Sequence, residues 1–322
     1  MTDKLRVASF FAGVGGIDLG FENTRRFETV YANEFDVYPA KTFELNNETK
    51  VDTRDITDID SSEIPDFDVC LAGFPCQAFS IAGKQQGFHD EGGRGILFFE
   101  LARIIEEKQP KIIFLENVKN LEAHDGGNTL KVILDTLGKI GYHCTYKVLN
   151  AMKHGNIPQN RERIYIVGFL NRNEFDKFDF PLKIPLTTTL DDIIDFQSKI
   201  DEKYYYTPGK YKGDIYDKLV KAMDDDRAVY QWRRHYVRKN KSGVVPTLTA
   251  NQGTGGHNVC LVKTDHGIRK MTPRECFNTQ GFPNYFNLPS DIADSRLYKQ
   301  AGNSVCVSVI ERIADKIVEA ID

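Results

Sequence analysis

The first 170 residues alternate short apolar runs with helical patterns, and this rhythm constrains the fold more than any other feature of the chain. The first run, residues 7–11, leads into a glycine turn at Gly13, Gly15 and Gly16, after which apolar residues recur at helical spacing. Further apolar runs predict strands, at residues 29–33, 67–72, 111–115, 142–149 and 164–169. This alternation predicts an open α/β sheet, which places its ligands at the carboxyl ends of its strands.

The βα rhythm stops near residue 171, where strands look short and Asp, Lys, Tyr and Thr dominate. We place a domain boundary near Pro185 and expect a smaller, mostly β or irregular domain after it. The 322 residues are 41% hydrophobic, which is ordinary globular composition. The chain shows neither a signal-peptide pattern nor an apolar run long enough for a membrane span, so we expect a cytoplasmic protein without a membrane partner.

Charge and cysteine content narrow the function classes. A formal net charge of -4 gives no indication of nucleic acid binding from the chain as a whole. The charge of individual segments is therefore the evidence for or against such binding. The six cysteines contain no CxxC pair and no regular framework, which predicts neither a metal site nor a disulfide scaffold.

The glycine turn and a later carboxylate together indicate a cofactor that carries a nucleoside. Glu34 ends the second predicted strand about 20 residues after the glycines, where a carboxylate can hold ribose hydroxyls. Asp55 and Ile56 follow a third short strand and are candidates for reading an adenine edge. Two plain alternatives stay open: the glycines form a simple tight connection, and Asp55 is an exposed residue before a turn.

Cys76 is the candidate nucleophile. It lies in the turn Gly73-Phe74-Pro75-Cys76-Gln77 after a buried strand, where nearby backbone N–H groups can lower the pKa of a thiol. The alternative is an inert buried cysteine. Glu116 follows another strand and is a general-acid candidate, although a helix-capping role for Glu116 and Asn117 is an equal alternative.

Two further groups of residues carry charge. Arg161 and Arg163 alternate at strand spacing before the strand at 164–169, so we expect both to face one side. Residues 227–241 contain six Lys or Arg, no Asp or Glu, and interleaved aromatics, which is typical of a surface that grips phosphates. A solvated surface face is the alternative. The loop 251–258 follows, and its amide side chains can read base edges.

In this order the motifs resemble the DNA (cytosine-5)-methyltransferase family over nearly the whole chain. The matching blocks are residues 11–16, 73–77, 116–118, 159–163, 274–276 and 300–304. Two departures are Ser9, where many members carry Asp, and the loop 89–95, which looks slightly lengthened. The resemblance implies a Rossmann-like S-adenosylmethionine-dependent methyltransferase sheet with a target-recognition domain of the size found in bacterial restriction-modification enzymes. It implies a catalytic domain at 1–185 completed by 300–322, a target-recognition domain at 186–272 and a hinge at 273–299.

The resemblance also implies a chemistry: Cys76 adds to C6 of a flipped-out cytosine, and C5 then accepts the methyl group of S-adenosylmethionine, leaving S-adenosylhomocysteine. Glu116 would act at N3, and Arg163, with Arg161, would stabilise the base and the carboxylate. No metal is expected. The cofactor-binding residues implied are Phe11, Gly13, Gly15, Glu34, Phe35, Asp55, Ile56, Pro75, Leu97, Asn303 and Ser304. The DNA-binding residues implied are Ser80, Arg233, Arg234, Thr249 and Gln252.

The expected partners are double-stranded DNA and a cognate restriction endonuclease acting on the same site, and a monomer is the default. Three other interpretations stay open. A nicotinamide-dependent dehydrogenase would use the glycine turn and Glu34 but leaves Cys76 and Glu116 without roles. A tRNA cytosine-5 methyltransferase would share the motifs but bind folded RNA. A catalytically silent DNA-binding member is disfavoured because Cys76 and Glu116 are both intact.

Overall fold

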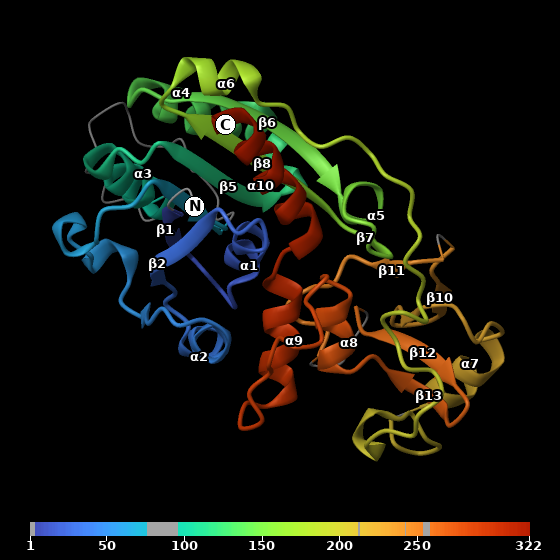
Figure 1. The fold of residues 1–322 in the computed structure, drawn as a ribbon. Coiled ribbons are helices and arrows are strands. Elements are labelled where there is room, and N and C mark those ends of the chain that lie inside the picture. Colours follow the sequence, from blue (N-terminus) through green and yellow to red (C-terminus); the bar gives the residue numbers. More distant parts are fainter. Residues whose placement is uncertain (1–3, 76–95, 212, 242, 254–257) are drawn as a thin grey trace. The chain divides into compact units, whose positions relative to one another are not determined.

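The computed structural model describes residues 4–75, 96–211, 213–241, 243–253 and 258–322 (Figure 1). The chain forms two compact units that each draw on separate stretches of sequence. The first unit contains Met1–Leu149, Glu162–Pro181 and Val309–Asp322. The second unit contains Asn150–Arg161 and Leu182–Ser308.

A seven-stranded mixed sheet forms the centre of the first unit, in the order β3-β2-β1-β4-β5-β8-β6. The strands β1 to β5 pair in parallel, whereas β8 runs antiparallel to β5. The bounds are β1 (Leu5–Phe10), β2 (Phe27–Asn33), β3 (Val51–Asp52), β4 (Val69–Ala72), β5 (Ile112–Val118), β6 (His143–Asn150) and β8 (Glu162–Phe169). Continuous burial along β4 and most of β5 fits central strands covered on both faces.

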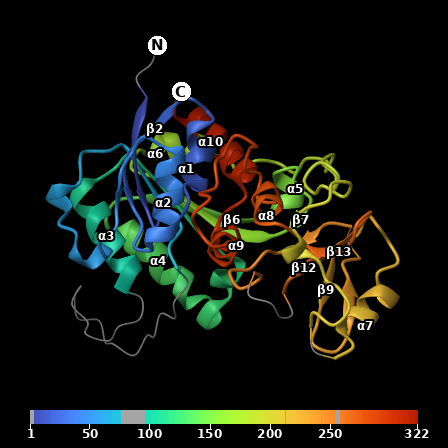
Figure 2. The same ribbon diagram turned by 90° about the horizontal axis from the view of Figure 1, so that it is seen from below.

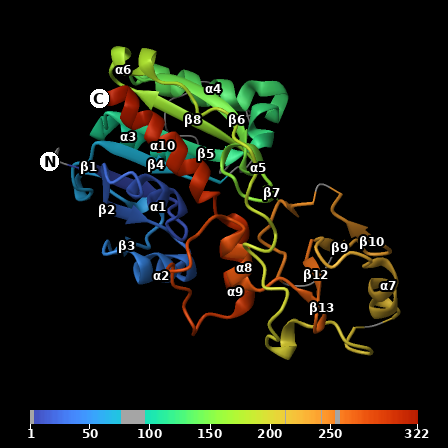
Figure 3. The same cartoon turned by 45° about the vertical axis from the view of Figure 1, so that its right-hand side comes forward.

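Helices cover both faces of this sheet, as Figures 1 and 3 show. On one face, Ile113 and Leu115 of β5 join a core with residues of α3 (Ile96–Lys108) and α4 (Asn128–Lys139). Phe114 points to the opposite face, because side chains alternate along a strand, and packs against Phe21 of α1 (Gly16–Glu22) with ring centroids 5.1 Å apart.

The first unit contains further helices besides α1, α3 and α4. The helix α10 (Val307–Ile321) packs closely against α1. A Cβ added at Gly20 of α1 would lie only 2.6 Å from the Ile310 side chain of α10. The others are α2 (Val37–Asn46), α6 (Arg172–Lys177) and the 3-10 helices η1 (Ile56–Asp58), η2 (Ser61–Glu63), η3 (Lys119–Glu122) and η4 (His124–Gly127).

The second unit is built on a small antiparallel sheet with the order β10-β9-β12-β13 (Figure 3), of which Figure 2 labels β9, β12 and β13. Its strands are β9 (Tyr230–Trp232), β10 (Val237–Lys239), β12 (Cys260–Thr264) and β13 (Gly267–Lys270), and β7 (Gln159–Asn160) pairs separately with β11 (Val245–Pro246). The helices are α5 (Ala151–His154), α7 (Ile215–Ala222), α8 (Pro273–Asn278) and α9 (Asp294–Asn303), with the 3-10 helix η5 (Glu202–Tyr204). Leu219 of α7 packs into the core of this sheet.

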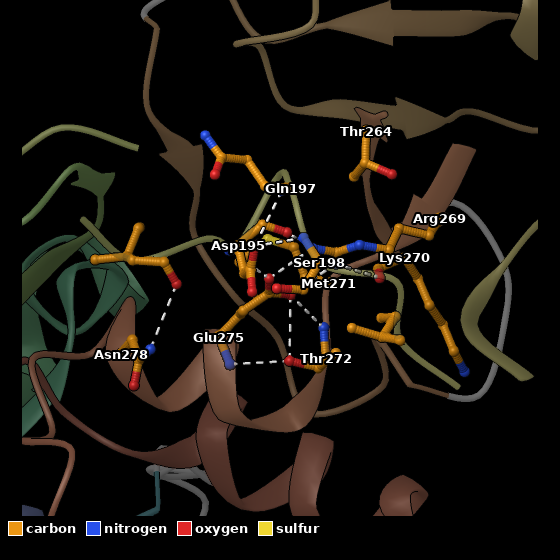
Figure 4. Close-up of polar contacts among 12 residues, drawn as sticks. Asp195, Gln197, Ser198, Thr264, Arg269, Lys270, Met271, Thr272, Glu275 and Asn278 are labelled. Carbon is orange, nitrogen blue, oxygen red and sulfur yellow. Dashed lines mark hydrogen bonds and ion pairs between the residues drawn. The ribbon is translucent and has the colours of Figure 1, made fainter. Parts of the chain in front are cut away.

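A buried ion pair joins three segments of the second unit (Figure 4). Arg269 on β13 is 0% exposed and pairs with the Glu275 carboxylate of α8 at 2.7 and 2.8 Å. Arg269 also donates to the backbone carbonyl of Asp195, and the Asp195 N–H donates to Glu275 at 3.0 Å. Glu275 closes a capping box with Thr272 at the start of α8. Each charge therefore has hydrogen-bonded partners, as burial requires.

The predicted α/β class and most of its strands are confirmed. The third strand has only two residues, and the strand predicted at 111–115 extends to Val118, so that Glu116 lies within β5. Residues 150–161 and 300–308 belong to the second compact unit, and the assignment of catalytic and recognition functions to separate domains stays a prediction. In the described part of the chain, no helix combines the length and apolarity that crossing a membrane demands.

Candidate active site

The strand β4 leads toward the predicted nucleophile. Cys76 and Ser80, like the loop 89–95, lie outside the described residues. Phe74 is buried and contacts the ring of Phe98 on α3 at a centroid distance of 5.7 Å, whereas Pro75 is exposed. The backbone therefore leaves the hydrophobic core between Phe74 and Pro75, immediately before the cysteine.

Glu116 and Arg163 form an ion pair on neighbouring strands. The Glu116 Oε1 atom lies 3.1 Å from Arg163 Nε, and the two side chains are 10% and 13% exposed. The antiparallel register of β5 and β8 opposes Glu116 to Tyr165 and Val118 to Arg163, which brings the two charged residues within reach. Because both groups are largely shielded from water, this charge-assisted contact is stronger than a surface ion pair.

The helix-capping alternative for Glu116 and Asn117 is wrong, since η3 begins without a side-chain cap. Instead, the Asn117 amide donates to the Phe74 carbonyl at 2.9 Å, and Asn117 is buried. A Cβ added at Gly73 would lie 3.6 Å from Glu116 Oε2. The carboxylate and the amide of β5 thus both border the segment that leads into Cys76.

Arg161 has a different environment from Arg163. Its guanidinium donates to the backbone carbonyls of Leu248 at 3.0 Å, Gly302 at 3.2 Å and Ser304, all in the second unit. Arg161 is 2% exposed. Arg161 lies between β7 and β8 and not within a regular strand, and the expectation that the two arginines act on the same groups stays a prediction.

The carboxyl ends of β1 and β2 bring the predicted cofactor residues together. Gly13 donates its N–H to Glu34 Oε2 at 2.9 Å, and Asp36 donates its N–H to Glu34 Oε1 at 2.8 Å. Gly13 has a φ of 57° with open space at its Cβ position, so a ligand can approach the backbone there. Phe35 beside them is 68% exposed. A glycine turn, a fixed carboxylate and an exposed ring suit a nucleoside with a ribose and a flat base.

The other predicted cofactor residues differ in burial and in their hydrogen-bond partners. The Asp55 carboxylate accepts from the Thr57 N–H at 3.0 Å and caps η1, and Ile56 is buried. Leu97 is partly buried against the core of the first unit. In the second unit, Asn303 ends α9 exposed, and Ser304 beside it is 9% exposed.

Asn33 and Asp18 are two polar residues that sequence reasoning missed. Asn33 donates to the carbonyls of Asp52 and Arg54, which joins the end of β2 to the stretch before Asp55. Asp18 is 0% exposed and accepts from Ser9 at 2.9 Å. It also accepts from Thr29 at 3.2 Å, and burial raises the pKa of Asp18 to about 7. The signal for Asp18 was an acid among apolar residues at helical spacing.

The basic segment 227–241 forms the hairpin of β9 and β10. Two of its cations pair with acids from outside the segment: Arg227 pairs with Asp191 at 2.9 Å, and Lys239 pairs with Asp225 at 2.9 Å. Arg234 lies at the hairpin tip with a φ of 64°, and Arg238 is exposed on β10. The cationic surface is therefore smaller than the composition of the segment indicates.

A chain of polar contacts connects this hairpin to the loop after β11. Arg233 donates to Asn258 Oδ1 at 3.2 Å, and Asn258 donates to Asn251 at 3.2 Å. Thr249 also donates to Asn251, at 2.8 Å. Gln252, in the same loop, is 3% exposed. Asn251 and Asn258 belong to the loop whose amide side chains we expect to read base edges.

Comparisons with known proteins identify the family of this chain. The family model for C-5 cytosine-specific DNA methylase matches residues 5–319. The chain is 58% identical over 316 residues to the type II methyltransferase M.Bsp6I of Bacillus sp. (strain RFL6), covering 98% of this chain and 99% of the relative. It is 40% identical over 324 residues to the type II methyltransferase M.HhaI of Haemophilus parahaemolyticus, covering 97% and 94%.

Solved structures show the same fold. A DNMT2 variant from Spodoptera frugiperda superposes with a TM-score of 0.74 at 19% identity, covering 98% of this chain and 100% of that one. A putative DNA modification methyltransferase from an E. coli prophage superposes with a TM-score of 0.67 at 21% identity, covering 99% of each chain.

The fold is that of an α/β methyltransferase with a mixed seven-stranded sheet and a second, small antiparallel sheet. The chain belongs to the C-5 cytosine-specific DNA methylase family. The predicted family is thereby confirmed, together with its activity on cytosine C5 in DNA and its use of S-adenosylmethionine. The dehydrogenase interpretation is wrong. Among the described residues, no cluster of three or more His, Cys, Asp or Glu is arranged to hold a metal ion.

Proposed function

We propose that the protein methylates C5 of a flipped-out cytosine in a specific double-stranded DNA sequence through a covalent bond between Cys76 and C6. The observation that carries this proposal is the shielded Glu116–Arg163 pair beside Gly73, three residues before the cysteine. A nucleophile, an acid and a cation then meet at one edge of the sheet, which is where open α/β sheets act on their ligands.

The residues have complementary roles in this proposal. The Cys76 thiolate adds to C6, while the protonated carboxyl of Glu116 donates a hydrogen bond or its proton at N3, where negative charge develops. Arg163 holds Glu116 in position and offers further N–H groups to the base. C5 then attacks the methyl carbon, the methyl–sulfur bond breaks and S-adenosylhomocysteine leaves. Transfer of the C5 proton to water and departure of the Cys76 thiolate then restore the aromatic ring.

S-adenosylmethionine supplies an electrophilic methyl group on sulfonium. We expect Glu34 to hold the ribose hydroxyls and Phe35 to stack on the adenine, because the carboxylate is fixed by two backbone N–H groups and the ring is 68% exposed. The turn at Phe11, Gly13 and Gly15 would border the methionine portion. The contributions of Asp55, Ile56, Pro75, Leu97, Asn303 and Ser304 are part of the same proposal.

The second unit would recognise DNA. Its hairpin offers Arg234 and Arg238 to phosphates, and the loop with Thr249 and Gln252 would meet the bases. Because relatives such as M.Bsp6I are type II methyltransferases, we propose that this chain protects host DNA in the cytoplasm against a cognate restriction endonuclease. We propose that it acts as a monomer, since one chain carries all of these groups.

Methyl transfer from labelled S-adenosylmethionine to plasmid DNA, synthetic duplexes and tRNA tests the proposal. We expect label in 5-methylcytosine of double-stranded DNA at one sequence, found by bisulfite sequencing, and none in tRNA. Cys76→Ser should abolish transfer and keep DNA binding, because a hydroxyl is a far poorer nucleophile at neutral pH. Wild-type turnover by Cys76→Ser, or label confined to tRNA, would refute it.

A further inference from the structure

A buried arginine holds the segment that carries Thr249 to the end of α9. The Arg161 guanidinium donates to the carbonyl of Leu248 from one segment, and to those of Gly302 and Ser304 from another. These acceptors lie 87, 141 and 143 residues away in the sequence. Guanidinium offers five N–H donors in one plane, so a single side chain can bridge several carbonyls that would otherwise be buried without donors.

Two further sets of contacts fix the position of residues 248–249. Gln159 accepts the N–H of Leu248 at 3.2 Å and donates to the Thr279 carbonyl at 2.7 Å. A Cβ added at Gly302 would overlap the backbone of Thr249, so α9 and the segment are in direct backbone contact. Backbone and side-chain contacts therefore act together on residues 248–249, just before the loop that contains Gln252.

Building on the proposed role of this loop in DNA recognition, we propose that Arg161 is a positioning residue for target recognition. Its guanidinium lies 2% exposed among backbone carbonyls of the second unit, whereas Arg163 pairs with Glu116. Displacing those carbonyls to bind a base would leave them buried without donors, which is costly.

A role of Arg161 in the chemistry and a role in positioning the recognition loop predict different changes in kcat and KM. A residue that stabilises the reacting groups lowers kcat when it is lost, even at saturating DNA. A residue that fixes the recognition loop instead raises KM for target DNA and reduces the preference for target over non-target duplexes, because the loop must be ordered before it can read bases. Measuring KM and kcat separately therefore distinguishes the positioning role from the chemical role.

Arg161→Lys is the first test, because lysine keeps the charge but cannot span three carbonyls. We expect KM for target DNA to rise about tenfold and target preference to fall by a similar factor, with kcat changed less than about threefold. Gly302→Ala should give the same pattern, because its added methyl group pushes the backbone of Thr249 away from α9 while Arg161 is unchanged. Leu219→Ala, in the core under α7, is the control for general destabilisation of the second unit.

A fall in kcat of about tenfold or more with KM unchanged would overturn the inference and place Arg161 in the chemistry. Equal loss of target preference in Leu219→Ala would also overturn it. If Arg161→Lys does not fold, Gly302→Ala decides the question, because it removes no hydrogen-bond donor. Absence of DNA methylation by the wild-type protein would instead refute the proposed function itself.

Discussion

Replacing Asp18 by Asn should stabilise the protein above neutral pH. Burial raises the pKa of Asp18 from 3.8 to about 7, with a smaller contribution from the Glu22 charge. Each pKa unit is worth about 1.4 kcal/mol, so carrying this charge in the folded state costs about 4 kcal/mol at pH 8. Asparagine removes that cost and keeps the shape, but it weakens one of the hydrogen bonds from Ser9 and Thr29, at about 1 kcal/mol.

The sign of the pH dependence follows from the raised pKa. A carboxyl that binds its proton more tightly when folded favours the folded state at low pH, and this contribution is lost as pH rises from about 4 to about 7. Asp18→Asn lacks this loss. Its advantage over wild type should therefore grow by about 2 to 3 kcal/mol between pH 5 and pH 8.

Urea unfolding followed by circular dichroism at several pH values measures this difference. Asp18→Ala is the matched variant: it should lose the same pH dependence but be less stable throughout, because Ser9 and Thr29 lose their acceptor. A difference between Asp18→Asn and wild type that stays constant from pH 5 to pH 8 would refute the reasoning, since the carboxyl would not then titrate in this range.

The remaining predictions concern binding. Glu34→Ala should weaken S-adenosylmethionine binding by about 2 to 3 kcal/mol in calorimetry and leave DNA binding intact, because charge-assisted hydrogen bonds to the ribose would be lost; unchanged cofactor affinity would contradict this. Arg234→Ala and Arg238→Ala should each lower the slope of log K against log salt by roughly one for all duplexes alike. Arg227→Ala should leave that slope unchanged, since Arg227 pairs with Asp191. An equal effect of all three variants would contradict the assignment of phosphate contacts to Arg234 and Arg238.

Features carried by local patterns could be predicted from the sequence. The apolar runs and the glycine turn foretold the parallel strands, because burial on both faces demands continuous apolar residues. Glu34 and Gly13 could be paired in advance, since the carboxyl ends of neighbouring parallel strands meet at one edge, and the structure joins them at 2.9 Å.

Features that depend on distant partners could not be predicted. Strand spacing made Arg161 and Arg163 look equivalent, yet their acceptors are set by tertiary contacts that no local pattern encodes. Similarly, the charge count of residues 227–241 overlooked acids such as Asp191 that fold against the segment. Asp18 was missed because its buried partners come from two strands.

The most direct test of covalent catalysis uses a duplex with 5-fluorocytosine at the target cytosine, incubated with the protein and S-adenosylmethionine. Fluorine at C5 cannot leave as a proton does, so the bond between Cys76 and C6 should persist after methyl transfer. The account predicts a DNA-shifted protein band on denaturing electrophoresis that requires S-adenosylmethionine and is absent for Cys76→Ser. Methylation of ordinary DNA without any such band from the fluorinated duplex, or a band that persists in Cys76→Ser, would contradict it.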